Sequence, residues 1–107
     1  MNRLETARAV PTLFEFPEEP ERQECWGRFL DLRPDGASLL CQSKVERGAR
    51  LRLRFDLPAG GRIEGLEGDA RKVRRDPDGY FRVELLWRTG EARERLHRAL
   101  LKIFVSA

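Results

Sequence analysis

The segment that most constrains the fold is residues 49–57, ARLRLRFDL, in which apolar and charged side chains alternate without a break. The apolar positions are Leu51, Leu53, Phe55 and Leu57. The charged positions are Arg50, Arg52, Arg54 and Asp56. Successive side chains of a β-strand point to opposite faces of the sheet, so this period of two is typical of a half-buried antiparallel strand. We therefore expect a sheet with a buried face and a charged face.

Five further segments have strand character, and short turns separate them. They are residues 11–16, 25–32, 37–41, 62–75 and 80–87. Pro34-Asp35-Gly36 is a strong turn signal, because proline presets φ and glycine can adopt a positive φ. Gly65 and Gly68 would permit a bulge in the long fifth segment, and Gly27 in the second. Six strands joined in this way predict an all-β, six-stranded antiparallel barrel.

The C-terminal segment, residues 89–105, is expected to be a helix. Thr89 is a suitable N-cap, and no proline or glycine interrupts residues 91–105. Apolar residues recur at helical spacing, at Ala92, Leu96, Ala99, Leu100 and Ile103. The expected organisation is an N-terminal arm over residues 1–10, followed by a barrel with its C-terminal helix over residues 11–107. Trp26 and Trp87 lie in predicted strands and are expected to fill the core.

Composition excludes several classes of function. The 21 basic residues face 18 acidic ones, a mixed surface rather than a dedicated nucleic-acid face. Cys25 and Cys41 form no CxxC pair and there is a single histidine, so no zinc site is expected and the thiols should be buried and reduced. The sequence contains neither a nucleophile elbow nor a phosphate-cradling loop, so we do not expect an enzyme. Neither a membrane span nor a secretory signal is present, so we expect a cytoplasmic protein.

The predicted strand order with its terminal helix, the turn DLRPDG at residues 31–36 and the run GARLRLRFDLP resemble the PilZ domain. PilZ domains are a bacterial family associated with cyclic di-GMP signalling. The resemblance implies a PilZ-like β-barrel with a C-terminal helix. It also implies a ligand site made by an RxxxR motif in an N-terminal arm and a D/N-x-S-x-x-G motif in a turn between strands. Arginine suits that role because its fork matches phosphate oxygens and guanine edges.

The chain keeps part of these motifs. Asp31 and Gly36 match the ends of the turn motif, but Arg33 stands where the family has serine. Arg8 is the best match to the second arginine of RxxxR, whereas Arg3 lies five residues before it instead of four. By resemblance, the candidate ligand-binding residues are therefore Arg3, Arg8, Asp31, Arg33 and Gly36.

Three functional hypotheses follow. The first is a non-enzymatic regulatory or adaptor domain whose nucleotide site is weakened or lost and which acts through an unidentified protein partner. The alternative is a genuine cyclic di-GMP receptor that uses Arg3, Arg8 and Arg33. The third is a small basic barrel that binds nucleic acid through Arg50, Arg52 and Arg54 and the bases of residues 71–75. We disfavour the third because the sequence predicts no exposed aromatic residues among these bases to stack on nucleotides. No metal or resident cofactor is expected.

Overall fold

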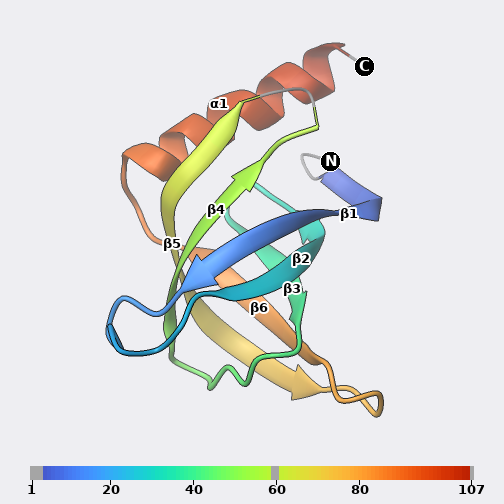
Figure 1. Cartoon of the computed structure of the whole chain (residues 1–107). Helices are drawn as coiled ribbons and strands as arrows, with labels where there is room; N and C mark the ends of the chain where they lie inside the picture. The colour runs from blue at the N-terminus through green and yellow to red at the C-terminus, as the bar shows by residue number, and fades with distance from the viewer. Residues whose placement is uncertain (1–3, 59–60, 107) are drawn as a thin grey trace.

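A computed structural model describes the backbone of residues 4–58 and 61–106, and the side chains of residues 10–58 and 61–102. It confirms the predicted all-β fold, a closed antiparallel barrel of six strands with a C-terminal helix (Figure 1). In chain order the elements are β1 (Leu4–Glu15), β2 (Cys25–Leu32), β3 (Gly36–Cys41), β4 (Arg50–Asp56), β5 (Arg62–Arg75), β6 (Phe81–Trp87) and α1 (Glu91–Ser106).

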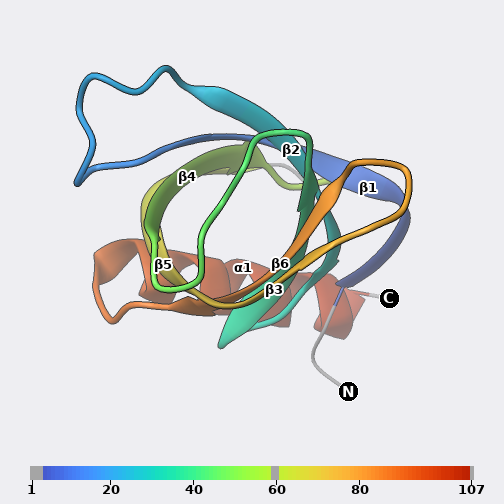
Figure 2. The same ribbon diagram turned by 90° about the horizontal axis from the view of Figure 1, so that it is seen from below.

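The strands follow the order β1-β2-β3-β6-β5-β4 around the barrel, and β4 closes it against β1. The closing pair is antiparallel and places Leu13 opposite Arg54. Figure 2 looks into the barrel from the end opposite α1, and the helix lies beyond its far end beside β5. Closure pairs both edges of the sheet, which removes the unpaired backbone groups that an open sheet would expose.

The alternation in β4 appears as predicted. Leu51, Leu53 and Phe55 are buried, while Arg52 and Arg54 are exposed. Arg50, which we expected to be exposed, is half-buried because it lies beside Asp69 of β5. In β6, the apolar residues Phe81, Val83 and Leu85 occupy every second position, which predicts them as core residues. Val83 and Leu85 are core residues. Phe81, also predicted as core, is only half-buried at the first position of that strand.

The predicted glycine bulges have different outcomes. At Gly65 the backbone has a φ of 69°, and the β4–β5 register shifts from Leu53↔Leu66 to Phe55↔Ile63. A left-handed φ of this kind favours glycine, so this bulge is confirmed. The bulge expected near Gly27 is wrong, because Gly27 remains paired with Cys41. The β2–β3 register shifts further along, between Phe29 and Asp31.

The two tryptophans occupy opposite environments. Trp87 is 4% exposed and packs edge to face against Phe29 in the core. Trp26 is 67% exposed, so its prediction as a core residue is wrong. The reason is the phase of β2: the neighbouring Cys25 packs against the core, which turns Trp26 outward beside Leu13 of β1.

The helix packs through the apolar stripe that the sequence predicted. Leu96 and Leu100 are fully buried, and Ala92 and Ala99 pack partly buried against the core. The side chain of Ile103 lies outside the described side chains. None of the described helical residues forms a segment long and apolar enough to cross a membrane.

The first strand is longer than predicted, because it begins at Leu4 instead of residue 11. Leu4 pairs with Leu32, and Glu5 pairs with Asp31. The register then shifts before Val10 pairs with Phe29. Much of the segment expected to be an arm is therefore a strand that runs along β2.

Candidate functional site

The turn between β2 and β3 carries the partial ligand motif, and β6 holds it in place. Arg33 N donates to Gly36 O at 2.8 Å, which closes the turn. Trp87 of β6 binds the turn twice: its backbone N donates to Asp35 O at 2.9 Å, and its indole Nε1 donates to Arg33 O at 3.1 Å. The turn is thus anchored to the core by a buried aromatic residue distant in the sequence.

Gly36 is required by a close approach of two strands. It is not among the glycines with positive φ, so a left-handed conformation does not explain it. A Cβ at this position would lie 2.1 Å from Leu85 O of β6. Any side chain would therefore collide with the backbone of the neighbouring strand.

Arg33 is surrounded by carboxylates. Its Nη1 lies 2.6 Å from Asp31 Oδ1, its Nε 3.6 Å from Asp35 Oδ1, and its Nη2 4.0 Å from Glu84 Oε1. Ser38 completes the cluster, because its backbone N donates to Asp31 Oδ1 at 3.1 Å and its hydroxyl donates to Glu84 Oε2. One guanidinium against three carboxylates gives these described side chains a net charge of −2. The positive charge of Arg33 is therefore more than compensated by Asp31 and Asp35 together with Glu84 of β6.

The structure brings together Asp31, Arg33 and Gly36 of the predicted site. Arg3 lies outside the described residues. The backbone of Arg8 lies in β1, within the register shift between Glu5 and Val10, and its side chain is not described. The strand that carries Arg8 therefore runs beside the end of β2 that leads into the turn.

Sequence reasoning missed two residues of this cluster, Ser38 and Glu84. Ser38 stands two positions beyond the motif, and Glu84 is an outward-facing acid in a strand of alternating character. Only the pairing of β3 with β6, which places Ser38 opposite Glu84, reveals that they belong to the site.

A groove adjoins the turn on the outer face of the barrel. Its volume is about 540 Å³, and it is open to solvent. The lining residues are Ser38, Lys72, Val73, Arg74, Arg82 and Glu84. Ser38 and Glu84 belong to both features, so the groove begins where the turn cluster ends.

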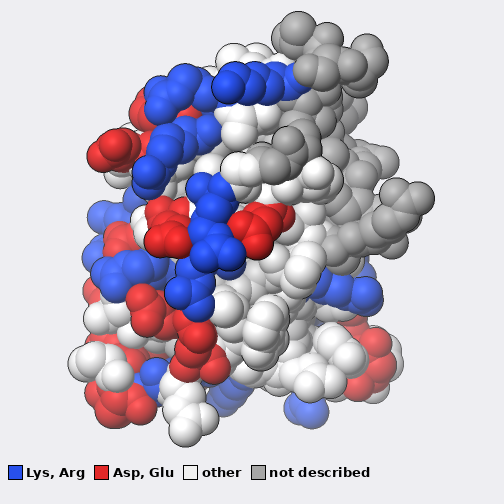
Figure 3. All heavy atoms as spheres, turned by 45° about the horizontal axis from the view of Figure 1, so that its top comes forward, with Lys and Arg blue, Asp and Glu red and all other residues white. Residues whose placement is uncertain are grey.

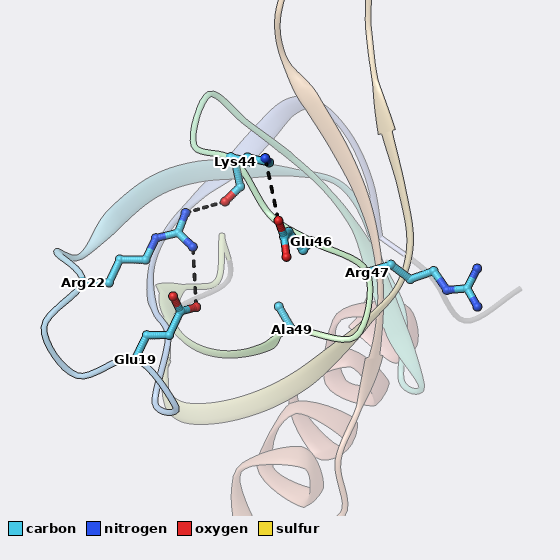
Figure 4. A pocket seen from close by; sticks show the side chains of 6 residues that line it. All are labelled: Glu19, Arg22, Lys44, Glu46, Arg47 and Ala49. Carbon is cyan, nitrogen blue, oxygen red and sulfur yellow. Dashed lines mark hydrogen bonds and ion pairs between the residues drawn. The ribbon is translucent and has the colours of Figure 1, made fainter.

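A second cavity, of about 390 Å³, lies at the end of the barrel away from α1 (Figure 4). Arg22 pairs with Glu19 at 3.7 Å, stacks on the Phe16 ring at 3.7 Å and donates to Lys44 O. Lys44 pairs with Glu46 at 3.7 Å, and the side chain of Arg47 points away from the cavity (Figure 4). The charges that line this cavity compensate one another, which favours a structural role.

The arginine row of β4 is also compensated. Arg52 lies 3.2 Å from Glu15 and 3.1 Å from Glu67, and hydrogen bonds to these two acids raise the pKa of its guanidinium. Arg54 lies 3.5 Å from Glu24. On the face shown in Figure 3, basic and acidic side chains are interleaved over the middle of the molecule. This pattern is typical of a solvated surface and does not resemble a phosphate-binding track.

Sulfur chemistry offers no alternative site. Cys25 and Cys41 are both free, with Cys41 buried as predicted and Cys25 half-buried. Burial raises the pKa of the Cys41 thiol to about 11, and the nearby Cys25 adds to this effect. A thiol with such a pKa stays protonated at neutral pH and is a poor nucleophile. No group of residues in the described part of the chain is arranged to hold a metal ion.

No protein-family model matches the chain, and no curated protein matches it. Solved structures do match. The PilZ domain of YcgR from Escherichia coli, determined with cyclic di-GMP, superposes with a TM-score of 0.70 at 11% identity and covers 97% of this chain and 89% of that chain. The PilZ domain of CeSA from a cellulose-synthesizing bacterium gives 0.66 at 15% identity, covering 94% and 96%.

The fold is PilZ-like. A third match is the inhibitor of motility MotI/DgrA of Bacillus subtilis, with a TM-score of 0.71 at 17% identity. It covers 97% of this chain and 50% of that chain, so this chain spans about half the length of that protein. These likenesses establish the PilZ-like architecture that the sequence predicted, and the chemistry of the turn has to be argued from its own residues.

Proposed function

We propose that this chain is a non-enzymatic PilZ-like regulatory or adaptor domain of bacterial cyclic di-GMP signalling, in the cytoplasm. Its nucleotide site is weakened or lost, and it acts through contacts with a partner protein. The observation that carries the proposal is the position of Arg33. It replaces the serine of the family motif and is bonded to Asp31, with Asp35 and Glu84 beside it.

The electrostatics of the turn support weak binding of a phosphate. An incoming phosphate needs positive charge and free donors, but Arg33 directs its donors at three carboxylates. Arg33 is also larger than the serine hydroxyl that the resemblance implies at this place. A charge-assisted hydrogen bond contributes roughly 1.5–3 kcal/mol. The loss of two such bonds would lower the affinity by about two to four orders of magnitude.

A second function, a genuine cyclic di-GMP receptor, is favoured by one observation. Glu5 of β1 pairs with Asp31, which brings the N-terminal strand alongside the turn. In this alternative the phosphates of the nucleotide are bound jointly by Arg3, Arg8 and Arg33. It requires Arg33 to leave its carboxylate partners when the ligand binds, which costs part of the binding energy.

Isothermal titration with cyclic di-GMP tests the proposal. We expect the wild type to bind more weakly than about micromolar, since two motif positions differ from the family. The double variant Leu4→Arg with Arg33→Ser restores an arginine four residues before Arg8 and a small hydroxyl in the turn. We expect it to bind more tightly than the wild type.

The control is the same double variant with Arg8→Ala added, which should lose the gained affinity. A wild type that binds at nanomolar concentration would overturn the proposal in favour of the receptor. A double variant that gains nothing would remove the motif-based account of the lost site and would leave only the protein-contact role.

A further inference from the structure

The hairpin of β5 and β6 places two arginines directly opposite each other. Arg74 of β5 pairs with Arg82 of β6 in the ladder, and like charges at such positions destabilise a sheet. Asp76, in the turn that follows β5, lies 3.5 Å from Arg74 Nε and 3.6 Å from Arg82 Nη2. One carboxylate therefore serves two guanidinium groups, and a positive charge remains.

Further bases extend this charge along β5. Arg71, Lys72 and Arg75 are exposed. Among the described residues, none of the three has a carboxylate within ion-pair distance. The guanidinium of Arg75 instead lies over the Phe81 ring, 5.8 Å from its centroid.

We call these five residues the basic ribbon: Arg71, Lys72, Arg74, Arg75 and Arg82. Three acids accompany them, Asp76, Asp78 and Glu84. Glu84 is already bound by Ser38 and lies near Arg33. Five bases against three acids leave a formal charge of +2 over residues 71–84. The end of the hairpin near its turn is therefore positively charged.

The basic ribbon also has a suitable shape for a ligand. The groove of about 540 Å³ runs between Lys72, Arg74 and Arg82, and Val73 contributes apolar surface to it. This volume lies within the range of roughly 300–1,000 Å³ that is typical of binding pockets. Three of the lining side chains are basic, one is acidic, and Val73 is apolar. Such a groove suits a segment that carries acidic and apolar side chains.

We propose that the basic ribbon binds an acidic segment of a partner polypeptide. This inference rests on the proposed function and identifies the surface through which the protein contact is made. Charge complementarity requires an anionic partner, because the hairpin carries uncompensated bases that include a like-charged cross-strand pair.

A polypeptide fits better than a nucleic acid for two reasons. The aromatic residues of the hairpin offer no open ring for base stacking, because Tyr80 and Phe81 are half-buried and Trp87 is buried. Asp76 and Glu84 interrupt the bases, and a phosphate backbone with regularly spaced charges would meet them with repulsion. A polypeptide can place acidic and neutral side chains to match such an interrupted pattern.

Fluorescence anisotropy with defined probes tests the inference in the absence of nucleotide. The main probe is a fluorescein-labelled peptide of Glu-Leu-Asp-Ser repeats, compared with a peptide of Gln-Leu-Asn-Ser repeats and with oligothymidine of equal formal charge. We expect the acidic peptide to bind at least about tenfold more tightly than its amide counterpart, a difference of about 1.4 kcal/mol. Binding should weaken as salt is added.

The variant Arg71→Glu with Lys72→Glu should abolish this preference. Both side chains are exposed, and circular dichroism verifies that the barrel remains folded. The matched control is Arg95→Glu with Arg98→Glu on α1, which changes the net charge by the same amount at exposed positions and should retain binding. The milder variant Arg71→Gln with Lys72→Gln should weaken binding and serves if the charge reversal unfolds the protein.

Three results would overturn the inference: equal binding of the acidic and amide peptides, equal loss in the hairpin and helix variants, or tighter binding of oligothymidine. The last would make the hairpin a nucleic-acid site. Tight cyclic di-GMP binding by the wild type would defeat the proposed function and would leave the peptide result standing, so the two failures are distinguishable.

Discussion

Replacement of Gly36 by alanine tests whether the glycine of the turn motif is explained by packing alone. The added Cβ would lie 2.1 Å from Leu85 O, whereas an ordinary contact is 3.4–4 Å. The two strands would have to separate by about 1.3 Å or more, the difference between these distances. Gly36 is the first residue of β3 and is paired with Leu86, so the separation opens the β3–β6 ladder at its end.

The cost combines two effects. Overpacking of a close contact costs roughly 1–3 kcal/mol. Each ladder or turn hydrogen bond that is lost costs about 0.5–1.5 kcal/mol, and the bond from Trp87 N to Asp35 O is next to the clash. We therefore expect Gly36→Ala to lower the free energy of unfolding by about 3 kcal/mol, a large fraction of the roughly 5–15 kcal/mol of a typical domain.

Urea unfolding followed by tryptophan fluorescence and circular dichroism measures this loss. The matched control is Gly48→Ala, where a Cβ would meet nothing within 4 Å and the cost comes from the φ of 92° alone. That strain is about 1–2 kcal/mol. A loss in Gly36→Ala no larger than in Gly48→Ala would refute the close-approach argument, and the glycine would then need a ligand-based explanation.

Two other predictions concern the core. Leu53→Ala should cost about 2–5 kcal/mol because Leu53 is fully buried, and a loss under about 1 kcal/mol would contradict the phase of β4. For Cys41, burial raises the pKa from 9.0 to about 11, so the unfolded chain loses the thiol proton first as pH rises. Stability should therefore fall between pH 9 and pH 11, by at most about 2.7 kcal/mol. Cys41→Ala should remove this part of the fall, and an identical pH profile in wild type and variant would disprove it.

The sequence predicts a strand well where its alternation is local. In β4 every second residue is apolar, which predicts that Leu51, Leu53 and Phe55 lie on the buried face, where the structure has them. β2 lacks a clean alternation, and its register against β3 shifts between Phe29 and Asp31. Trp26 shares its exposed face with Arg28, and the shift further along breaks this phase, so the apolar pattern of the whole segment does not reveal the exposure of Trp26.

The candidate site depends even more on distant pairing. The turn and its two end residues, Asp31 and Gly36, could be predicted from a short motif. The carboxylate of Glu84 reaches the site only because β6 lies beside β3, a contact between residues 46 positions apart. The reason for Gly36, which the sequence suggested to be a positive φ, is likewise a contact with β6.

The three carboxylates around Arg33 also determine how the affinity for cyclic di-GMP should change when the family motif is restored. Arg33→Ser alone would leave Asp31, Asp35 and Glu84 without the guanidinium that now lies among them. The turn would become more negative, so the single change should weaken phosphate binding although it restores the family residue. Leu4→Arg must supply the missing charge from β1, whose next residue, Glu5, pairs with Asp31. The two changes should therefore be strongly non-additive in titration with cyclic di-GMP, with a gain in affinity only when both are present. Additive effects would mean that the acids of the turn do not oppose the ligand. A weakened affinity of the site for cyclic di-GMP would then have another origin.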